Sequence, residues 1–104
     1  MKTIAIDFDD TYTANPKMFN KIIDIFKEND YKVCICTSRD PKKSMDVEKS
    51  NVRSIVDYIF FTDGEPKKEF MESLGIKIDI WIDDFPKSII DRCYDNFTPN
   101  PNIK

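Results

Sequence analysis

Residues 4–11 read IAIDFDDT, a short apolar run that ends in acids and a hydroxyl. The apolar and β-branched side chains of residues 3–6 predict a strand buried on both faces. Three acids at the end of a buried strand destabilise one another unless a cation or hydrogen-bond donors offset their charge. We therefore expect Asp7, Asp9 and Asp10 to emerge at the carboxyl end of a central strand, where α/β sheets bind their ligands.

Beyond this stretch, strand-like and helix-like segments alternate along the chain. An amphipathic helix is predicted over residues 16–29, opened by Pro16, and an apolar run predicts a buried strand over residues 31–36. A weaker helical pattern follows and carries Met45, Val52, Ile55 and Val56. The later expected elements are a strand over 58–61, a helix from Pro66 with Phe70, Met71 and Leu74 as its apolar residues, a left-handed cap at Gly75, a strand over 76–82, and a helix from Pro86 that buries Ile89, Ile90, Cys93 and Tyr94.

This alternation predicts a doubly wound α/β fold, a three-layer sandwich around a parallel sheet of about five strands. The fifth strand would be short and lie near residues 95–97. We expect one domain over residues 1–97 and a loose C-terminal tail over residues 98–104. No inserted domain is expected, because the connections after the first and third strands are short.

The composition of the chain excludes several classes of protein. Its 104 residues carry a net charge of −3, so an extended basic surface that binds nucleic acid is not expected. The absence of histidine excludes a Ser-His-Asp triad, a Cys-His pair and a histidine metal site. No signal peptide or membrane span is indicated, because no apolar run approaches about 18 residues. Cys34, Cys36 and Cys93 are expected to be reduced packing residues of a cytoplasmic protein.

Polar side chains also follow two of the other predicted strands. Thr37, Ser38 and Arg39 come directly after the second strand, and Asp83 and Asp84 follow the fourth. Each group has a plainer explanation when taken alone, because hydroxyls cap turns and acids suit the start of a helix. Carboxylates that face the acids of the first strand, however, require a hard cation such as Mg²⁺.

Two lysines open the helix that precedes the fourth strand. Lys67 is spaced to share the inward, buried face of Phe70, Met71 and Leu74, whereas Lys68 lies about 100° round the helix. We choose Lys67 as the residue that faces the acids, and Lys68 stays the alternative.

The pattern Asp-x-Asp-x-Thr at residues 7–11 resembles motif I of the haloacid dehalogenase (HAD) superfamily, most of whose members are Mg²⁺-dependent phosphohydrolases. The other three motifs of that superfamily have counterparts at the expected strand or helix ends. They are Thr37 for motif II, Lys67 for motif III and the pair Asp83-Asp84 for motif IV. The resemblance covers residues 2–90 and is to small capless members such as those of phages and bacteria.

The resemblance implies hydrolysis of a phosphate monoester through an aspartyl-phosphate. Asp7 would be the nucleophile, and Asp9 would protonate the leaving oxygen and then activate water. Mg²⁺ would be held by the Asp7 carboxylate, the Asp9 backbone carbonyl and Asp83, with Asp84 acting on a bound water. Thr37 and Lys67 would hold the phosphoryl oxygens, and Thr11 would brace the first loop. An acid at position 9 argues against dehalogenation, because dehalogenases of the superfamily lack it.

An uncapped site is expected to be open to solvent. Such a site suits a bulky substrate such as a nucleic-acid end or a phosphoprotein, or it requires a lid from a partner or from a second copy of the chain. A small nucleotide is compatible with it as well. Ser38 and Arg39 are candidate contacts to the substrate phosphate, since a guanidinium binds phosphate through two hydrogen bonds. A surface arginine with no such role is the plainer alternative.

Two other functions, a signalling receiver domain and a binding protein without catalysis, would also use acids at strand ends. A signalling receiver domain would use Asp9 and Asp10 for metal and Asp63 as phosphoacceptor, but the pair Asp83-Asp84 would then have no role. A HAD-like binding protein without catalysis is the second alternative, although every expected catalytic group is present. Turnover of a phosphate ester distinguishes both from a phosphatase.

Overall fold

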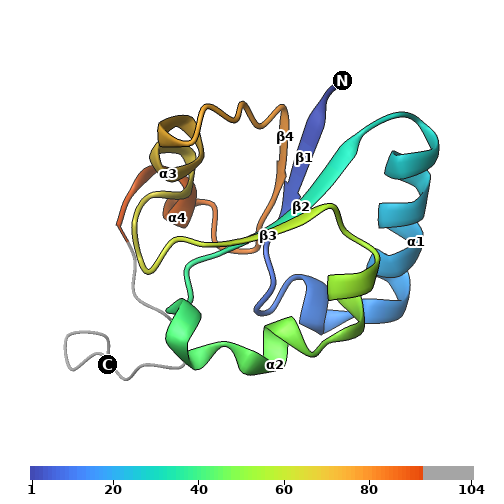
Figure 1. Ribbon diagram of the computed structural model, residues 1–104, viewed down its shortest axis with the longest axis horizontal. Coiled ribbons are helices and arrows are strands. Elements are labelled where there is room, and N and C mark those ends of the chain that lie inside the picture. Colours follow the sequence, from blue (N-terminus) through green and yellow to red (C-terminus); the bar gives the residue numbers. More distant parts are fainter. Residues whose placement is uncertain (93–104) are drawn as a thin grey trace.

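The computed structural model describes residues 1–92, which form an α/β fold around a parallel four-stranded sheet (Figure 1). The strands are β1 (Thr3–Ile6), β2 (Lys32–Thr37), β3 (Tyr58–Phe61) and β4 (Ile80–Ile82), in the spatial order β3-β2-β1-β4. The α-helices are α1 (Pro16–Glu28), α2 (Met45–Glu48), α3 (Lys67–Ser73) and α4 (Lys87–Ile90). Short 3-10 helices lie at η1 (Tyr12–Ala14), η2 (Pro41–Lys43) and η3 (Asn51–Ser54). The strand that carries the acids is central, as predicted.

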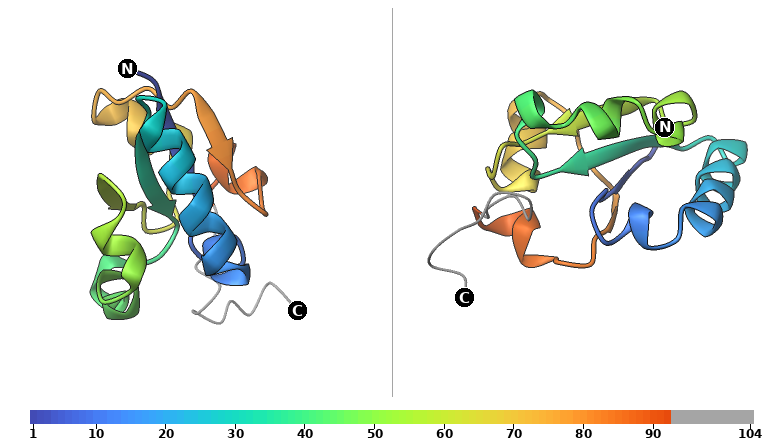
Figure 2. Two further views of the ribbon diagram at one scale, coloured as in Figure 1. Left: turned by 90° about the vertical axis from the view of Figure 1, so that its right-hand side faces the viewer. Right: turned by 90° about the horizontal axis from the view of Figure 1, so that it is seen from below.

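Both faces of the sheet bury apolar side chains. On one face Ile4 and Ile6 of β1 pack in a cluster with Ile23 of α1, and on the other face Ala5 packs in a cluster with Met71 of α3. Figure 1 shows α1 and α3 on opposite sides of the strands, and the right-hand view of Figure 2 shows the same for α1 and α4. This arrangement follows from the period of two along a strand, which sends neighbouring side chains to opposite faces.

The cysteines of β2 behave as the sequence predicts. Cys34 and Cys36 are buried free thiols on the same face of the sheet. Burial raises the pKa of each thiol to about 12. Both therefore stay protonated and serve as packing residues rather than nucleophiles.

Three predicted elements match the structure closely. α1 begins at Pro16, and the side chain of Asn15 caps it by accepting a hydrogen bond of 3.1 Å from the Met18 N–H. β3 has the predicted bounds. Gly75 has a φ of +76°, the left-handed conformation predicted for the end of the third helix.

The segment between β2 and β3 forms three short helices, η2, α2 and η3, instead of one continuous helix. Val47 of α2 and Val52 of η3 are its buried anchors, whereas Met45 is exposed. The Ser50 hydroxyl donates to the Val47 carbonyl at 2.7 Å and the Ser54 hydroxyl donates to the Asn51 carbonyl at 2.8 Å. Such side-chain bonds to the backbone compete with a continuous helix.

The prediction of a fourth strand over residues 76–82 is too long by several residues. The Asp79 N–H donates to the Thr3 carbonyl, so the preceding residues lie beyond the start of β1, the only strand with which β4 pairs among residues 1–92. Ile76 and Ile78 pack instead against the α3-side core.

Two apolar residues predicted to be buried are exposed. Leu74 follows the last residue of α3 and is 50% exposed, and Ile90 is 68% exposed. α4 is a single turn that directs Ser88 inward, and a residue two positions later lies on the opposite side of a helix. The predicted burial of these two residues was therefore wrong.

The last predicted features lie outside the described residues. They are the burial of Cys93 and Tyr94, the fifth strand near residues 95–97 and the loose tail over 98–104. Residues 1–92 contain four strands, fewer than the five predicted for the whole chain. No helix in this part of the chain is long and apolar enough to cross a membrane.

Candidate active site

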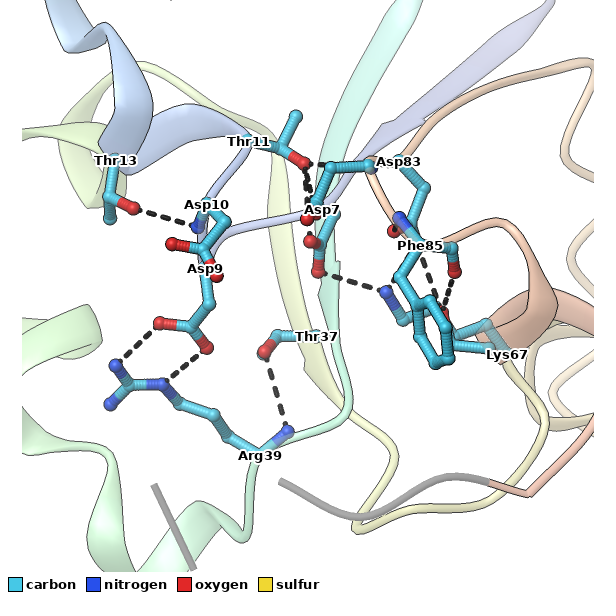
Figure 3. Close-up of polar contacts among 12 residues, drawn as sticks. Asp7, Asp9, Asp10, Thr11, Thr13, Thr37, Arg39, Lys67, Asp83 and Phe85 are labelled. Carbon is cyan, nitrogen blue, oxygen red and sulfur yellow. Dashed lines mark hydrogen bonds and ion pairs between the residues drawn. The ribbon is translucent and has the colours of Figure 1, made fainter. Parts of the chain in front are cut away.

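Polar side chains from three strands and one helix meet at the carboxyl edge of the sheet (Figure 3). Asp7 follows β1, Thr37 ends β2 and Asp83 follows β4, while Lys67 is the first residue of α3. They converge because all four strands run parallel, which brings their carboxyl ends to one edge. The sequence therefore predicted correctly which segments contribute to this edge.

Lys67 is the buried cation of the site. Its Nζ lies 2.9 Å from Oδ1 of Asp7 and 2.5 Å from Oδ2 of Asp83, and the residue is only 1% exposed. Burial by itself lowers the pKa of the amine, but the two carboxylates outweigh it and the pKa of Lys67 is raised. Lys68 is exposed, so the choice of Lys67 as the inward lysine is confirmed.

Three carboxylates gather beside this lysine. One oxygen from each of Asp7, Asp83 and Asp84 lies within 4.8 Å of the others, close enough to hold a metal ion together. The Thr11 hydroxyl lies 2.8 Å from Oδ1 of Asp84 and 3.2 Å from Oδ2 of Asp7, and it accepts from the Asp84 N–H at 3.1 Å. Thr11 thus connects the first and fourth strand ends, as a bracing residue should.

Residues after the acid pair hold Asp83 in place. The Phe85 N–H donates to Oδ1 of Asp83 at 2.9 Å, and the Ser88 hydroxyl donates to Oδ2 at 3.3 Å. Ser88 is buried, whereas the Phe85 side chain is exposed next to the site. Sequence reasoning missed both, because neither belongs to a motif; the only signal was their position in the loop and helix that follow Asp84.

The electrostatics of Asp7 reflect its surroundings. Burial is the main cause that raises the pKa of Asp7, to about 7; Lys67 opposes this and Asp83 adds to it. A buried carboxylate next to a second acid is costly to ionise unless positive charge is close. The acids of the site therefore carry more negative charge than Lys67 alone neutralises, and a second cation would stabilise them.

This pKa predicts a pH dependence of stability for the protein free of divalent cations. The folded pKa of Asp7 is about 7, above the value of 3.8 for an unperturbed Asp, so between these values the folded state binds a proton that the unfolded chain releases. Stability from this group is thus present at low pH and lost as pH rises through about 7. Denaturant unfolding in chelator at about pH 5 and about pH 8 should show a smaller loss on going to high pH in Asp7→Asn than in wild type. Equal pH dependence in the two proteins would contradict the raised pKa.

Asp9 occupies the other side of the first loop and pairs with Arg39. The guanidinium donates from Nε to Oδ2 at 2.8 Å and from Nη2 to Oδ1 at 2.7 Å. Figure 3 shows this pair on one side of Asp7, with Lys67 and Asp83 on the other. The Asp9 side chain is not among the acids that cluster for a metal ion in residues 1–92. Arg39, predicted as a contact to substrate phosphate, is buried and bound to carboxylates.

The hydroxyl residues Thr37, which ends β2, and Ser38, which follows it, lie beside Arg39 at the same edge of the sheet. Thr37 is buried, and its Oγ1 accepts a hydrogen bond of 3.3 Å from the Arg39 N–H. Ser38 is half-buried, and its carbonyl accepts from the Gly64 N–H at 3.0 Å. The turn after β3 therefore supports the loop that carries Thr37.

Cavity volume alone does not identify this site. A shallow pocket of about 280 Å³ borders Thr11, Asp83 and Asp84. Two larger pockets, each about 480 Å³, lie on the α3 side of the sheet, where Trp81 lines one and Phe60 the other. Their linings hold no cluster of acids, so the chemistry of the side chains, not the volume, distinguishes the strand-end site.

Comparisons with protein-family models, with curated proteins and with solved structures find no match for this chain.

Proposed function

We propose that this protein is a Mg²⁺-dependent phosphomonoester hydrolase with a doubly wound, three-layer HAD-like core. The observation that carries the proposal is the joint placement of Asp7, Asp83 and Asp84 beside the buried amine of Lys67 at the carboxyl edge of the sheet. Carboxylates and an amine in this arrangement suit a phosphoryl group, whose charge must be neutralised for an anionic nucleophile to approach.

The side chains fit Mg²⁺ by their chemistry. Asp7, Asp83 and Asp84 offer hard oxygen ligands, and the backbone carbonyl of Asp9 would be a fourth. When bound, Mg²⁺ would supply positive charge to the phosphoryl oxygens and to the crowded acids. The raised pKa of Asp7 supports this assignment, because a cation would offset the cost of ionising that group.

The reaction would proceed in two displacements. An Asp7 carboxylate oxygen forms a bond to phosphorus while the bond from phosphorus to the leaving oxygen breaks, and Asp9 gives its proton to that oxygen. Asp9 then accepts a proton from water as the water oxygen bonds to phosphorus and the Asp7–phosphorus bond breaks. Lys67 and Thr37 would hold the phosphoryl oxygens, and Thr11 keeps the strand ends together.

The open surroundings of the site suit a large substrate, or a smaller one that a partner subunit covers. α1 begins soon after Thr11, and a short turn joins β3 to α3, so neither connection holds a cap. We propose nucleotides or nucleic-acid ends as the substrate class, with a partner or a second copy of the chain as an alternative lid, and a cytoplasmic location. The receiver alternative has less support, because Asp63 is exposed in a turn and does not belong to the acid cluster.

Phosphate release from a panel of monoesters tests the proposal. The panel comprises p-nitrophenyl phosphate, nucleotides, and oligonucleotides phosphorylated at the 3′ or the 5′ end, each with Mg²⁺ and with chelator. We expect turnover that depends on Mg²⁺ and differs among the substrates. A folded protein that binds Mg²⁺ but releases phosphate from none of them would favour the binding-protein alternative.

A further inference from the structure

Arg39 is held from several directions in the loop that follows β2. Two of its nitrogens donate to both oxygens of Asp9, and Nη1 donates to Oδ1 of Asp46 in α2 at 2.6 Å. Its guanidinium carbon lies 5.4 Å from the centre of the Phe8 ring. Its carbonyl accepts a hydrogen bond of 3.2 Å from the Asp63 N–H. The guanidinium therefore has a defined position relative to the first loop.

This position determines where the Asp9 carboxylate lies. A bidentate contact fixes both the direction and the rotation of a carboxylate, which a single hydrogen bond does not. With both oxygens on Arg39, Asp9 points away from Lys67 and Asp83 (Figure 3). The acids of the site are thus divided into a metal-binding group and one separate carboxylate.

The same geometry argues against a direct role for Arg39 in binding substrate phosphate. Arg39 is only 4% exposed, and its guanidinium already donates to Asp9 and Asp46, so little of it is open to a phosphate that arrives from solvent. Displacing Asp9, which is itself buried, would leave a buried carboxylate without its charged partner.

We propose that Arg39 is a positioning residue that holds Asp9 for proton transfer, with Asp46 as the anchor of Arg39. The inference rests on the proposed phosphatase function. When the bond from phosphorus to the leaving oxygen breaks, its electron pair goes to that oxygen, which receives the Asp9 proton. To give up this proton, one Asp9 oxygen leaves Arg39 and turns toward the leaving group, while the second oxygen keeps its hydrogen bond to Arg39. The remaining contact therefore holds Asp9 in place as its carboxyl group turns.

The dependence of rate on the leaving group separates this role from others. Phenyl phosphate releases a basic oxygen that needs a proton, whereas 2,4-dinitrophenyl phosphate releases a weakly basic oxygen that needs little help. kcat/KM covers the steps up to departure of the leaving group, so it reports this proton transfer. A general acid contributes about 10²–10⁴-fold, so Arg39→Met should lower kcat/KM for phenyl phosphate by about 10²-fold and for the dinitrophenyl ester by less than about tenfold.

Two milder variants keep the test decisive if Arg39→Met fails to fold. Arg39→Lys retains the charge with a single-point contact and should recover part of the lost rate on phenyl phosphate. Asp46→Asn alters an exposed partner and should give the same selective loss at a few-fold level. Arg53→Met, which removes the exposed ion pair with Glu48, is the matched control and should change neither substrate.

The other outcomes overturn the inference in distinct ways. Equal losses on both esters, together with weaker inhibition by inorganic phosphate, would make Arg39 a substrate contact. Unchanged rates in Arg39→Lys and Asp46→Asn would make the ion pairs purely structural. A wild-type protein that hydrolyses neither ester with Mg²⁺ would overturn the proposed function, and this inference with it.

Discussion

Asp7→Asn is expected to lower Mg²⁺-dependent phosphate release by on the order of 10⁴-fold or more. An amide cannot replace the carboxylate as nucleophile, and the variant also removes the negative charge of one of the three clustered carboxylates. Steady-state phosphate release on the best substrate of the panel measures the loss. Acid quenching with a ³²P-labelled substrate should trap a phosphorylated protein in wild type and none in the variant.

The control for this substitution is Asp24→Asn, which makes the same chemical change on the exposed side of α1. It should leave the rate and the labelling unchanged. Full activity in a folded Asp7→Asn protein would exclude Asp7 as the nucleophile, and labelling that persists would assign the phosphoacceptor to another residue.

Lys67→Met is expected to lower the free energy of unfolding by about 3 kcal/mol near neutral pH and to abolish turnover. The loss arises because the Asp7 and Asp83 carboxylates stay buried without the amine that donates to both. It should be smaller at about pH 5, since Asp7, whose pKa is already raised, is then protonated and needs no partner. Denaturant unfolding at the two pH values, in chelator, measures both effects.

Lys68→Met is the matched control, because it makes the same change one residue later on the exposed side of α3. Its effect on stability should stay within about 0.5 kcal/mol, and its activity should match wild type. Equal effects of the two substitutions would show that the buried amine of Lys67 does not stabilise the carboxylates of the site. Mg²⁺ should restore part of the stability of Lys67→Met, because a cation replaces some of the lost positive charge.

The elements that position the site follow from local patterns in the chain. The apolar runs that end at Asp7 and at Asp83 predicted two strands of a parallel sheet, because such a sheet buries its strands on both faces. The structure pairs these two strands directly. Helical spacing from Phe70 and Met71 was enough to direct Lys67 inward and Lys68 outward. These predictions depend on the spacing of apolar residues along a single strand or helix, and residues close together in the sequence determine that spacing.

The lengths of the short elements did not follow from such patterns. β4 begins only where β1 offers a pairing partner, and α4 stops after one turn with Ser88 inward. Burial of Leu74 and Ile90 was predicted from their position on a helical period, but Leu74 lies just past the end of α3 and Ile90 lies opposite the inward Ser88 of α4. Pairing and packing partners, which lie far away in sequence, decide these ends.

The sequence by itself determined the order of strands and helices and which segments deliver acids, hydroxyls and a lysine to one edge of the sheet. Only the tertiary structure decided how the charges pair: Lys67 with Asp7 and Asp83, and Arg39 with Asp9 and Asp46. The physical reason is that a pattern sets the direction of a side chain along its own element. The partner of a charge is instead chosen by the distances between elements and by the cost of burying a charge alone.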